Sequence, residues 1–302
     1  IPHPEALHVS YMHTPMRYAW DMWPQYFPGS GLAMRYVVPL LLNYLRTWDV
    51  TSAQRVDHFV ANSRFVARRI AKYYRRQATV IHPPVDTTFF SPGATQEEYY
   101  LMVTALVPYK GVDLAIEAFN ALRRPLKIIG SGPLAKKLQA RAGPHIEWLG
   151  WCAGEDLRQY YAACRAVIFP VLEDFGIVPL EANAAGRPAI ALGQGGALET
   201  VIPANDPALP TAVHPAIGTQ YAPTGVFFFQ RTPEALQEAV HFFEAHESLL
   251  CPQALRQHAL QFDREHFKQR MRQFLATLGT TYSGAGEPPN DCAAIRERHS
   301  PC

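Results

Sequence analysis

The chain has 302 residues, of which 48% are hydrophobic, and its net charge is +2. This length predicts about two domains, and the near balance of charge gives no support for nucleic acid as a partner. The five cysteines show no CxxC or metal-ligand spacing, which favours free thiols in a reducing cytoplasm over a disulfide framework. The longest apolar run, 37–45, is far shorter than the ~20 residues of a transmembrane helix, so it predicts a buried or interfacial helix.

The first part of the chain alternates strand and helix patterns. Strands are predicted at 7–12, 58–62 and 79–83, and helices at 35–47 and 64–75. The start resembles the middle of a domain and shows no signal peptide, so we expect the chain to lack its natural beginning. Residues 1–92 are therefore predicted to be a partial N-terminal Rossmann-like domain with the first part of a Pro-containing linker, which spans 82–98.

From Tyr99 onward the alternation is regular. Strands are predicted at 99–104, 126–130, 145–150, 165–170, 188–192 and 225–229, with helices at 112–122, 133–142, 154–164, 179–185, 233–246, 252–262 and 264–278. Near-continuous apolar strands separated by helices indicate a parallel, doubly wound α/β sheet. Residues 93–278 are predicted to be this second domain, with a loop insertion at 203–223 and a disordered tail at 279–302.

The stretch "VLEDFGIVPLEANAAGRPAI" (171–190) places two carboxylates around a strand-to-helix turn. Glu173 is expected on the loop after the strand, and Glu181 in the first turn of a helix that begins near Pro179. With the free amides around Gly176, the turn could hold a polyhydroxylated, phosphorylated ligand. A helix-capping glutamate and a solvated loop glutamate are the alternative interpretation.

Further ligand-type residues follow other predicted strands. Lys110 precedes a helix, where it could neutralise a departing diphosphate or be a surface lysine in a turn. Gly195 and Gly196 in "GGALET" open a short helix and could cradle phosphate. His13 and Arg17 lie among aromatic residues after the first strand, and a loop histidine is often purely structural. The turn "GSGP" (130–133) is interpreted as structural.

In combination, these motifs resemble family-4 retaining glycosyltransferases. The "EDFGIVPLE" segment with its E-x7-E spacing, "VPYKGVDLAIEAF", "GSGP", "GGALETV" and "ANSRFVARRIAKYY" occur in the order of that family. "HVSYMHTPMRYAWD" is similar to bacterial mannosyltransferases that build O-antigen and other surface polysaccharides. The resemblance spans about residues 8–278 and implies the GT-B fold: two Rossmann-like domains that face a cleft, the N-terminal one incomplete here.

The resemblance also implies roles for individual residues. Glu173 would bind hydroxyls of the donor sugar, Glu181 the ribose hydroxyls, and Lys110 the diphosphate, while His13 would approach the transferred sugar from the acceptor side, where Arg17 also lies. The amides of Phe175, Gly176 and Ile177, with Gly195 and Gly196, would contact sugar and phosphate. The donor would be a nucleotide-sugar, with GDP-mannose favoured, and the acceptor a growing glycan or a lipid-linked one.

The family implies no cofactor and no divalent metal, and no DxD-like pair follows a predicted strand. One departure is Ala105, because many members carry an arginine five positions before the lysine. Ala105 and the late start leave a catalytically dead nucleotide-sugar-binding module as an alternative. A nucleotide-sugar epimerase has a similar architecture but not the E-x7-E pattern, and a nicotinamide dehydrogenase is disfavoured because no GxGxxG follows a strand.

The segment "SRFVARRIAKYYRR" (63–76) predicts a strongly basic helix. Its apolar stripe is expected to be Val66, Ile70 and Tyr73, with arginines and a lysine over the remainder. Such a face could contact anionic lipid head groups near a lipid-linked acceptor, or could simply be solvated. We therefore expect a cytoplasmic protein, with peripheral contact to the inner face of the cytoplasmic membrane as one interpretation.

Overall fold

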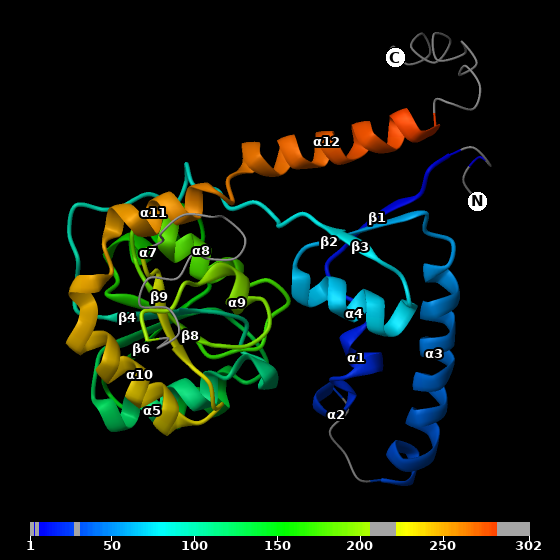
Figure 1. The fold of residues 1–302 in the computed structure, drawn as a ribbon. Coiled ribbons are helices and arrows are strands. Elements are labelled where there is room, and N and C mark those ends of the chain that lie inside the picture. The colour runs from blue at the N-terminus through cyan, green and yellow to red at the C-terminus, as the bar shows by residue number, and fades with distance from the viewer. Residues whose placement is uncertain (1–2, 4–5, 27–30, 206–221, 283–302) are drawn as a thin grey trace, which may run out of the picture.

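The computed structural model describes residue 3 and residues 6–26, 31–205 and 222–282, and this part of the chain contains two parallel sheets. The strand orders are β1-β2-β3 and β6-β5-β4-β7-β8-β9, and every pairing between these strands is parallel. We call residues 6–82 the N-terminal unit and residues 85–262 the C-terminal unit. Figure 1 shows the two units side by side, and the predicted α/β class with parallel sheets is confirmed.

The N-terminal unit contains the three-stranded sheet. Its elements are β1 (Val9–Met12), α1 (Arg17–Trp20), α2 (Trp23–Tyr26), the π-helical turn η1 (Ala33–Val37), α3 (Val38–Ala53), β2 (His58–Ala61), α4 (Arg64–Tyr74) and β3 (Ala78–Val80). α3 begins later and ends later than the predicted helix at 35–47. Phe59, Val66, Ile70 and Tyr74 form the centre of a small core.

The C-terminal unit contains the six-stranded sheet. Its elements are β4 (Tyr100–Val103), the 3-10 turn η2 (Pro108–Lys110), α5 (Val112–Leu122), β5 (Leu126–Ile129), α6 (Ala135–Gln139), β6 (Ile146–Gly150), α7 (Gly154–Ala163), β7 (Ala166–Phe169), α8 (Ile177–Ala184), β8 (Ala189–Leu192), α9 (Ala197–Thr200), β9 (Gly225–Phe228), α10 (Pro233–His246), the 3-10 turn η3 (Glu247–Leu249) and α11 (Pro252–Leu260). The predicted alternation of strands and helices is confirmed. The predicted loop insertion at 203–223 lies mostly outside the described residues.

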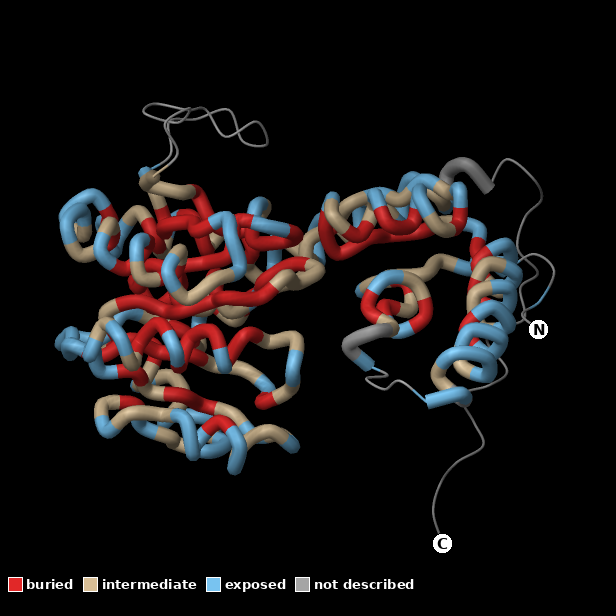
Figure 2. Tube along the Cα trace, turned by 90° about the horizontal axis from the view of Figure 1, so that it is seen from below, coloured by how far each residue is buried: buried red, intermediate tan, exposed pale blue. Residues whose placement is uncertain are grey.

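Both faces of the six-stranded sheet are covered by helices. Because side chains alternate along a strand, Tyr100 and Met102 pack into a cluster that includes Phe119 of α5 and Phe243 of α10. Leu101, between them, packs into the opposite cluster, which includes residues of α7, α8 and α11. Figure 2 shows the buried positions concentrated in this sheet and its flanking helices. The buried sheet provides a firm base for the loops at its edge.

The chain order of the strands reverses between β4 and β7. From β4 the chain adds β5 and β6 on one side, and then returns to add β7, β8 and β9 on the other side. In an open parallel sheet, the carboxyl ends of the strands at such a reversal leave a crevice between diverging loops, where ligands bind. The ends of β4 and β7 are therefore the place to look for a site.

Two connections join the units. The chain passes from β3 through residues 81–84, and the Val85 amide then donates to the Phe262 carbonyl at 2.8 Å, so the second half of the predicted linker packs on the C-terminal unit. The last helix, α12 (Arg264–Tyr282), returns across the N-terminal unit, where Phe267 contacts Tyr11 at 5.8 Å between ring centroids (Figure 1). α12 continues past the predicted start of the tail at 279, and residues 283–302 lie outside the described residues.

Candidate functional site

A cavity of about 470 Å³ lies at the predicted crevice and is shared by both units. Val103 and Thr104 at the end of β4, and Phe169 and Val171 at the end of β7, form part of its wall. Its lining residues are His13, Asn62, Pro83, Val103, Thr104, Lys110, Phe169, Val171, Glu173, Asp174, Phe175, Gly176, Ile177 and Val178. The structure thus brings together Lys110, Glu173, the Phe175–Ile177 turn and, from the opposite unit, His13.

Close backbone contacts fix the loop that carries Glu173. Gly176 is the N-cap of α8 and has a φ of +89°, a left-handed conformation that favours glycine. A Cβ at Gly196 would lie 2.3 Å from the Cα of Phe175, and the Gly196 amide donates to the Glu173 carbonyl at 2.8 Å. The sequence predicted Gly195 and Gly196 as a phosphate cradle, but the Gly196 amide is already used to hold this loop.

Lys110 reaches the site from η2. The next residue, Gly111, has a φ of +70°, and a Cβ there would lie 2.6 Å from the Pro170 carbonyl oxygen, so only glycine lets this loop approach the end of β7. The Lys110 Nζ donates to the Glu173 carboxylate, and each side chain is 21% exposed. Such a pair can offer a cation to phosphate oxygens next to a carboxylate that accepts hydrogen bonds from hydroxyls.

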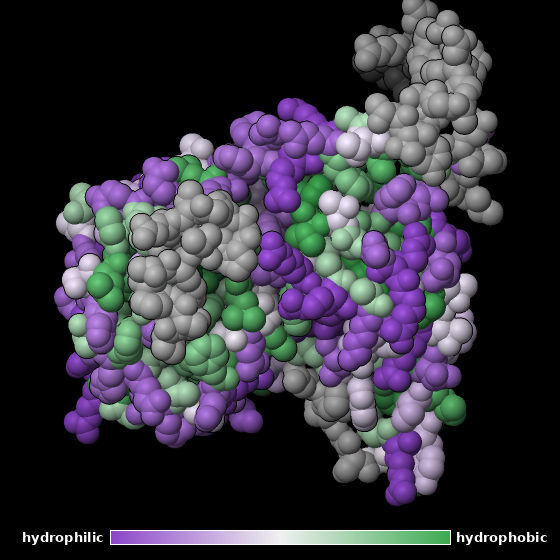
Figure 3. Space-filling view, viewed as in Figure 1, coloured by the Kyte–Doolittle hydropathy of each residue, from purple (hydrophilic) through white to green (hydrophobic). Residues whose placement is uncertain are grey.

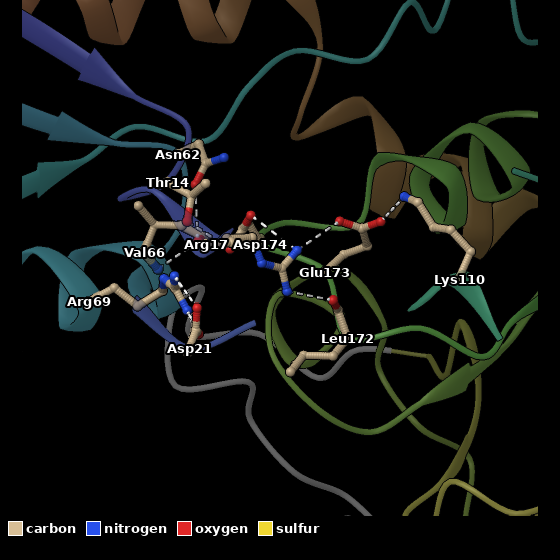
Figure 4. A network of polar contacts seen from close by, with 11 residues as sticks. Thr14, Arg17, Asp21, Asn62, Val66, Arg69, Lys110, Leu172, Glu173 and Asp174 are labelled. Carbon is tan, nitrogen blue, oxygen red and sulfur yellow. Dashed lines mark hydrogen bonds and ion pairs between the residues drawn. The ribbon is translucent and has the colours of Figure 1, made fainter. Parts of the chain in front are cut away.

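Arg17, from α1, crosses to the same loop. Its guanidinium donates to the Leu172 carbonyl at 3.0 Å and lies 3.5 Å from an Asp174 oxygen and 3.8 Å from a Glu173 oxygen (Figure 4). Arg17 is buried. It was predicted on the acceptor side; the structure shows its guanidinium engaged with the loop that carries Glu173.

Asp174 was not singled out from the sequence, although it follows Glu173 directly. Its carboxylate accepts from the Thr14 hydroxyl at 3.2 Å, and its backbone carbonyl accepts from the Ser63 hydroxyl at 2.5 Å. Burial raises the pKa of Asp174, against the opposing influence of the nearby Arg17 and Arg69 charges. The Asp174 side chain thus joins the loop that carries Glu173 to the N-terminal unit.

Glu181 lies apart from the lining residues, in the second turn of α8. The helix begins at Ile177 rather than near Pro179, so the expectation that Glu181 lies in the first turn was wrong. A proline is tolerated in the first turn because its missing N–H has no helical partner there. Glu181 accepts a hydrogen bond from the Tyr161 hydroxyl at 2.6 Å, and burial raises the pKa of its carboxyl group.

His13 follows β1 and is exposed at the cavity. Its ring contacts Tyr11 edge-to-face, with the centroids 5.5 Å apart. His13 lines the cavity from the N-terminal unit, whereas Lys110 lines it from the C-terminal unit. Asn62, after β2, lines the same wall.

Glu199, in α9, forms a second contact between the units. Its carboxylate accepts from the amides of Arg64 and Phe65, at 2.8 and 2.9 Å, and lies 3.1 Å from the His82 Nε2. Burial acts to raise the pKa of Glu199, but the hydrogen bonds from His82 and the two amides outweigh it and leave the pKa below its usual range. The carboxylate therefore sits on the positive end of the α4 dipole. Only the glycines of "GGALET" were noticed in the sequence.

The turn "GSGP" has the structural role that was predicted for it. A Cβ at Gly130 would lie 1.7 Å from the Thr104 carbonyl oxygen, and one at Gly132 would lie 2.5 Å from that of Leu106. Among the described residues, no group of three or more His, Cys, Asp and Glu side chains could hold a metal ion. Within the same residues, no helix is long and apolar enough to span a bilayer.

Comparison with known proteins identifies this architecture. HepE of Anabaena, whose crystal structure contains UDP and glucose, superimposes with a TM-score of 0.67 at 18% identity, covering 89% of this chain and 71% of that one. The two parallel-sheet units that face a shared cavity are the GT-B fold of glycosyltransferases.

Proteins of similar sequence indicate the family of glycosyltransferases to which this chain belongs. A GDP-mannose-dependent alpha-(1-6)-phosphatidylinositol monomannoside mannosyltransferase of Mycolicibacterium smegmatis is 33% identical in an alignment of 172 residues that covers 46% of this chain and 45% of that protein. The O-antigen chain mannosyltransferase C of Escherichia coli is 31% identical in an alignment of 126 residues that covers 36% of this chain and 34% of that protein. The profile of the family "Glycosyl transferases group 1" matches residues 85–259. The chain belongs to this family and resembles its mannosyltransferases; it spans about half the length, or less, of the curated relatives it matches.

Proposed function

We propose that this protein transfers a hexose, with retention of anomeric configuration, from a nucleotide-sugar to a growing surface glycan or a lipid-linked acceptor. The observation that carries this proposal is the contact between Lys110 and Glu173 at the strand-order reversal, across the cavity from His13. A cation for the leaving diphosphate and a carboxylate for sugar hydroxyls thus lie on one unit, and an acceptor-side histidine lies on the other.

GDP-mannose is the favoured donor. The Mycolicibacterium smegmatis relative is a GDP-mannose-dependent mannosyltransferase, and the Escherichia coli relative is an O-antigen chain mannosyltransferase. The UDP and glucose in the HepE structure support a nucleotide-sugar as the ligand class. A lipid-linked acceptor would place the protein in the cytoplasm, at the inner face of the cytoplasmic membrane.

The proposed reaction uses no enzyme nucleophile. The acceptor hydroxyl oxygen bonds to the anomeric carbon while the bond from that carbon to the diphosphate breaks, and the hydroxyl proton leaves with the diphosphate. Lys110 and the amides of Gly176 and Ile177 stabilise the developing charge, so we assign this role to them rather than to a divalent metal. Glu173 orients the sugar, Glu181 holds the ribose, and His13 contacts the transferred sugar.

The first experiment is calorimetric titration of the 302-residue chain with GDP-mannose, UDP-glucose and UDP-N-acetylglucosamine. We expect GDP-mannose to bind most tightly, and Lys110→Met to weaken that binding. Incubation with GDP-mannose and a membrane extract should then release GDP and give a product whose anomeric configuration is read by NMR. An inverted product would overturn the retaining mechanism, and failure to bind any of the three donors would overturn the assignment of the cavity.

A nucleotide-sugar-binding protein without transferase activity is the second candidate. It is favoured by Ala105, an exposed residue after β4 at a position where the family resemblance implies arginine, because one cation fewer would then face the diphosphate. Tight donor binding without GDP release, combined with activity gained in Ala105→Arg, would support this second function.

A further inference from the structure

Glu173, the carboxylate proposed to bind the donor sugar, is shared between two cations from different units. The Lys110 ammonium of the C-terminal unit contacts one carboxylate oxygen, and the Arg17 guanidinium of the N-terminal unit lies 3.8 Å from the other. The side chain of Arg17 is 10% exposed and that of Glu173 is 21% exposed. Water therefore screens these contacts less than it would on an open surface. The orientation of this carboxylate depends on both units.

The Arg17 guanidinium is held by the same loop that carries Glu173. One terminal nitrogen donates to the Leu172 carbonyl at 3.0 Å, and the other lies 3.5 Å from the Asp174 carboxylate (Figure 4). A planar guanidinium has several N–H groups in fixed directions and can make such contacts at the same time, whereas an ammonium is a single point charge on a flexible chain. Arg17 thus contacts three consecutive residues of the loop and restrains where Glu173 can point.

A second buried arginine of this network pairs within the N-terminal unit (Figure 4). Arg69 was expected on the exposed polar side of α4, but it is buried and paired with Asp21. On the face that Figure 3 shows, hydrophilic side chains gather where the two units meet. At this polar boundary Arg69 is committed to its own unit, whereas Arg17 crosses to the loop that carries Glu173.

Binding of a nucleotide-sugar changes the balance between the two cations. In the proposed reaction Lys110 contacts the diphosphate, which has more negative charge than a carboxylate, and the flexible lysine stem lets the ammonium turn toward phosphate oxygens. Glu173 then keeps Arg17 as its charged partner, and the carboxylate oxygen that Lys110 has left can accept from a sugar hydroxyl. A carboxylate held in one direction by a neighbouring group is prepared for such recognition.

We propose that Arg17 is a positioning residue for the donor sugar: it holds the Glu173 carboxylate in the orientation that accepts from a sugar hydroxyl once Lys110 contacts the diphosphate. Arg17 is not among the residues that line the cavity, so it acts through Glu173 rather than by touching the substrate. The inference rests on the proposed function and deepens it, because a residue of the N-terminal unit then contributes to selection of the donor sugar.

The test is calorimetric titration of the full chain and of Arg17→Met with a nucleotide-sugar and with its nucleoside diphosphate. The pair is GDP-mannose with GDP, or UDP-glucose with UDP if the parent chain prefers the latter. Arg17→Met should raise the dissociation constant of the nucleotide-sugar about tenfold and leave that of the nucleoside diphosphate within about twofold.

Two outcomes separate failure of this inference from failure of the proposed function. A parent chain that binds nucleotide-sugar, with the same ratio of the two dissociation constants in Arg17→Met, would overturn the positioning role and leave the donor site in place. A parent chain that binds neither nucleotide-sugar nor nucleoside diphosphate would overturn the proposed function and, with it, the role of Arg17.

Two controls distinguish positioning from general support of the N-terminal unit. Arg46→Met removes another arginine that supports α1, since the Arg46 Nε donates to the Ala19 carbonyl at 2.6 Å. Thr14→Val removes a contact between the units, the hydrogen bond to Asp174 at 3.2 Å, without removing a cation. Both variants should keep the parent's ratio of dissociation constants. If Thr14→Val changes that ratio as much as Arg17→Met does, Arg17 merely joins the units and the inference fails.

A double-mutant cycle tests whether Arg17 acts through Glu173. In a Glu173→Gln background, Arg17→Met should change the affinity for nucleotide-sugar by less than about twofold further, because the charged pair is already broken. Arg17→Lys in the parent background should restore the affinity in part, because an ammonium keeps the charge but not the fixed directions of the guanidinium. An effect of Arg17→Met that is equally large with and without the Glu173 carboxylate would contradict the inference.

A further variant keeps the test valid if Arg17→Met folds poorly. Loss of Arg17 leaves the buried Asp174 carboxylate with one neighbouring cation fewer, and an uncompensated buried charge is destabilising. The double variant Arg17→Met with Asp174→Asn removes both charges, and circular dichroism checks that it folds. It should bind nucleotide-sugar about tenfold more weakly than Asp174→Asn alone. Equal affinity of these two variants would overturn the inference.

Discussion

The two units differ in the size of their buried cores and in the side chains that they expose to solvent. The C-terminal unit buries both faces of a six-stranded sheet, whereas the N-terminal unit has three strands and exposes the apolar face of its longest helix. The contacts between the units near the cavity include charged groups, such as Asp174 with Arg17 and Glu199 with the start of α4. Charged contacts can exchange with water more readily than a packed core. The comparison indicates a C-terminal unit built on a large buried core and an N-terminal unit joined to it partly through charged contacts.

The largest expected effect is for Lys110, on the C-terminal unit. Replacement of Lys110 by methionine should lower kcat for donor turnover by about 10³-fold, because the leaving diphosphate loses its cation in a cavity of low polarity. The measurement is the rate of GDP release at saturating donor. Lys136→Met, on an exposed position of α6, is the matched control, and an unchanged kcat in Lys110→Met would contradict the assignment.

The next largest effect is expected for His13, on the N-terminal unit. His13→Ala should lower kcat by about 10²-fold while leaving the donor dissociation constant unchanged, because the proposed nucleotide site lies on the other unit. Steady-state kinetics and calorimetry together separate the two quantities. His246→Ala, at an exposed position of α10, should change neither. A loss of donor affinity that matches the loss of kcat would place His13 in ground-state binding instead.

Glu181 tests whether the donor site extends beyond the cavity walls. Glu181→Ala should weaken binding of free GDP by about 1.5–3 kcal/mol, the usual value of a hydrogen bond to a charged group. Tyr161→Phe removes the 2.6 Å hydrogen bond to Glu181 but keeps the carboxylate, so it should retain most of the GDP affinity. If both variants bind GDP as the parent does, Glu181 has no ribose role.

Glu199 tests how strongly the units are joined. Glu199→Gln should lower the free energy of unfolding by about 1.5 kcal/mol, because the amide cannot accept from two backbone amides as a carboxylate does. Since the pKa of Glu199 is lowered in the folded protein, its contribution is complete above the ordinary glutamate pKa and is lost as the pH falls through the folded value.

Urea unfolding at neutral and acidic pH measures this contribution. The difference between the parent chain and Glu199→Gln should shrink on acidification. Glu155→Gln, which breaks an ion pair within α7, is the control and should have little effect at either pH. A difference between Glu199→Gln and the parent that grows as the pH falls would contradict the proposed charge state.

The last prediction is that removal of divalent metal ions has no effect on turnover. Chelation with EDTA should leave donor turnover unchanged, because Lys110 and helix amides neutralise the diphosphate in the proposed reaction. The measurement is GDP release before and after chelation, with added Mg²⁺ as the comparison. A strict requirement for Mg²⁺ or Mn²⁺ would overturn this part of the proposal.

Local signals predicted most of the fold. α5 and α10 begin and end where the sequence placed them, because each has a clear start signal: Gly111 before α5, and the Thr232 cap with Pro233 at the start of α10. The start of α8 was misplaced because Pro179 is acceptable at several positions of a first turn. The decisive signal was Gly176, whose positive φ ends the loop.

Contacts between distant residues were beyond the sequence. The pairing of Arg17 with the 172–174 loop joins residues about half the chain apart, and the contact of Glu199 with α4 is similar. No local pattern indicates which charges meet across two units. The outward direction of the apolar side chains of α3 was likewise not fixed by periodicity, because it depends on Asp49 finding partners at Trp20 and Tyr74.

The two connections between the units pass through one small region. Val85 is hydrogen-bonded to Phe262, just before α12 begins, so both chain crossings lie side by side. If one unit rotates relative to the other about this region, contacts close to it, such as His82 with Glu199, move only slightly. The stack of Tyr26 on Tyr109 involves α2, which lies at the far end of the N-terminal unit from this pivot (Figure 1). Opening of the cleft should therefore part the two tyrosines first, and admit ligands from that end.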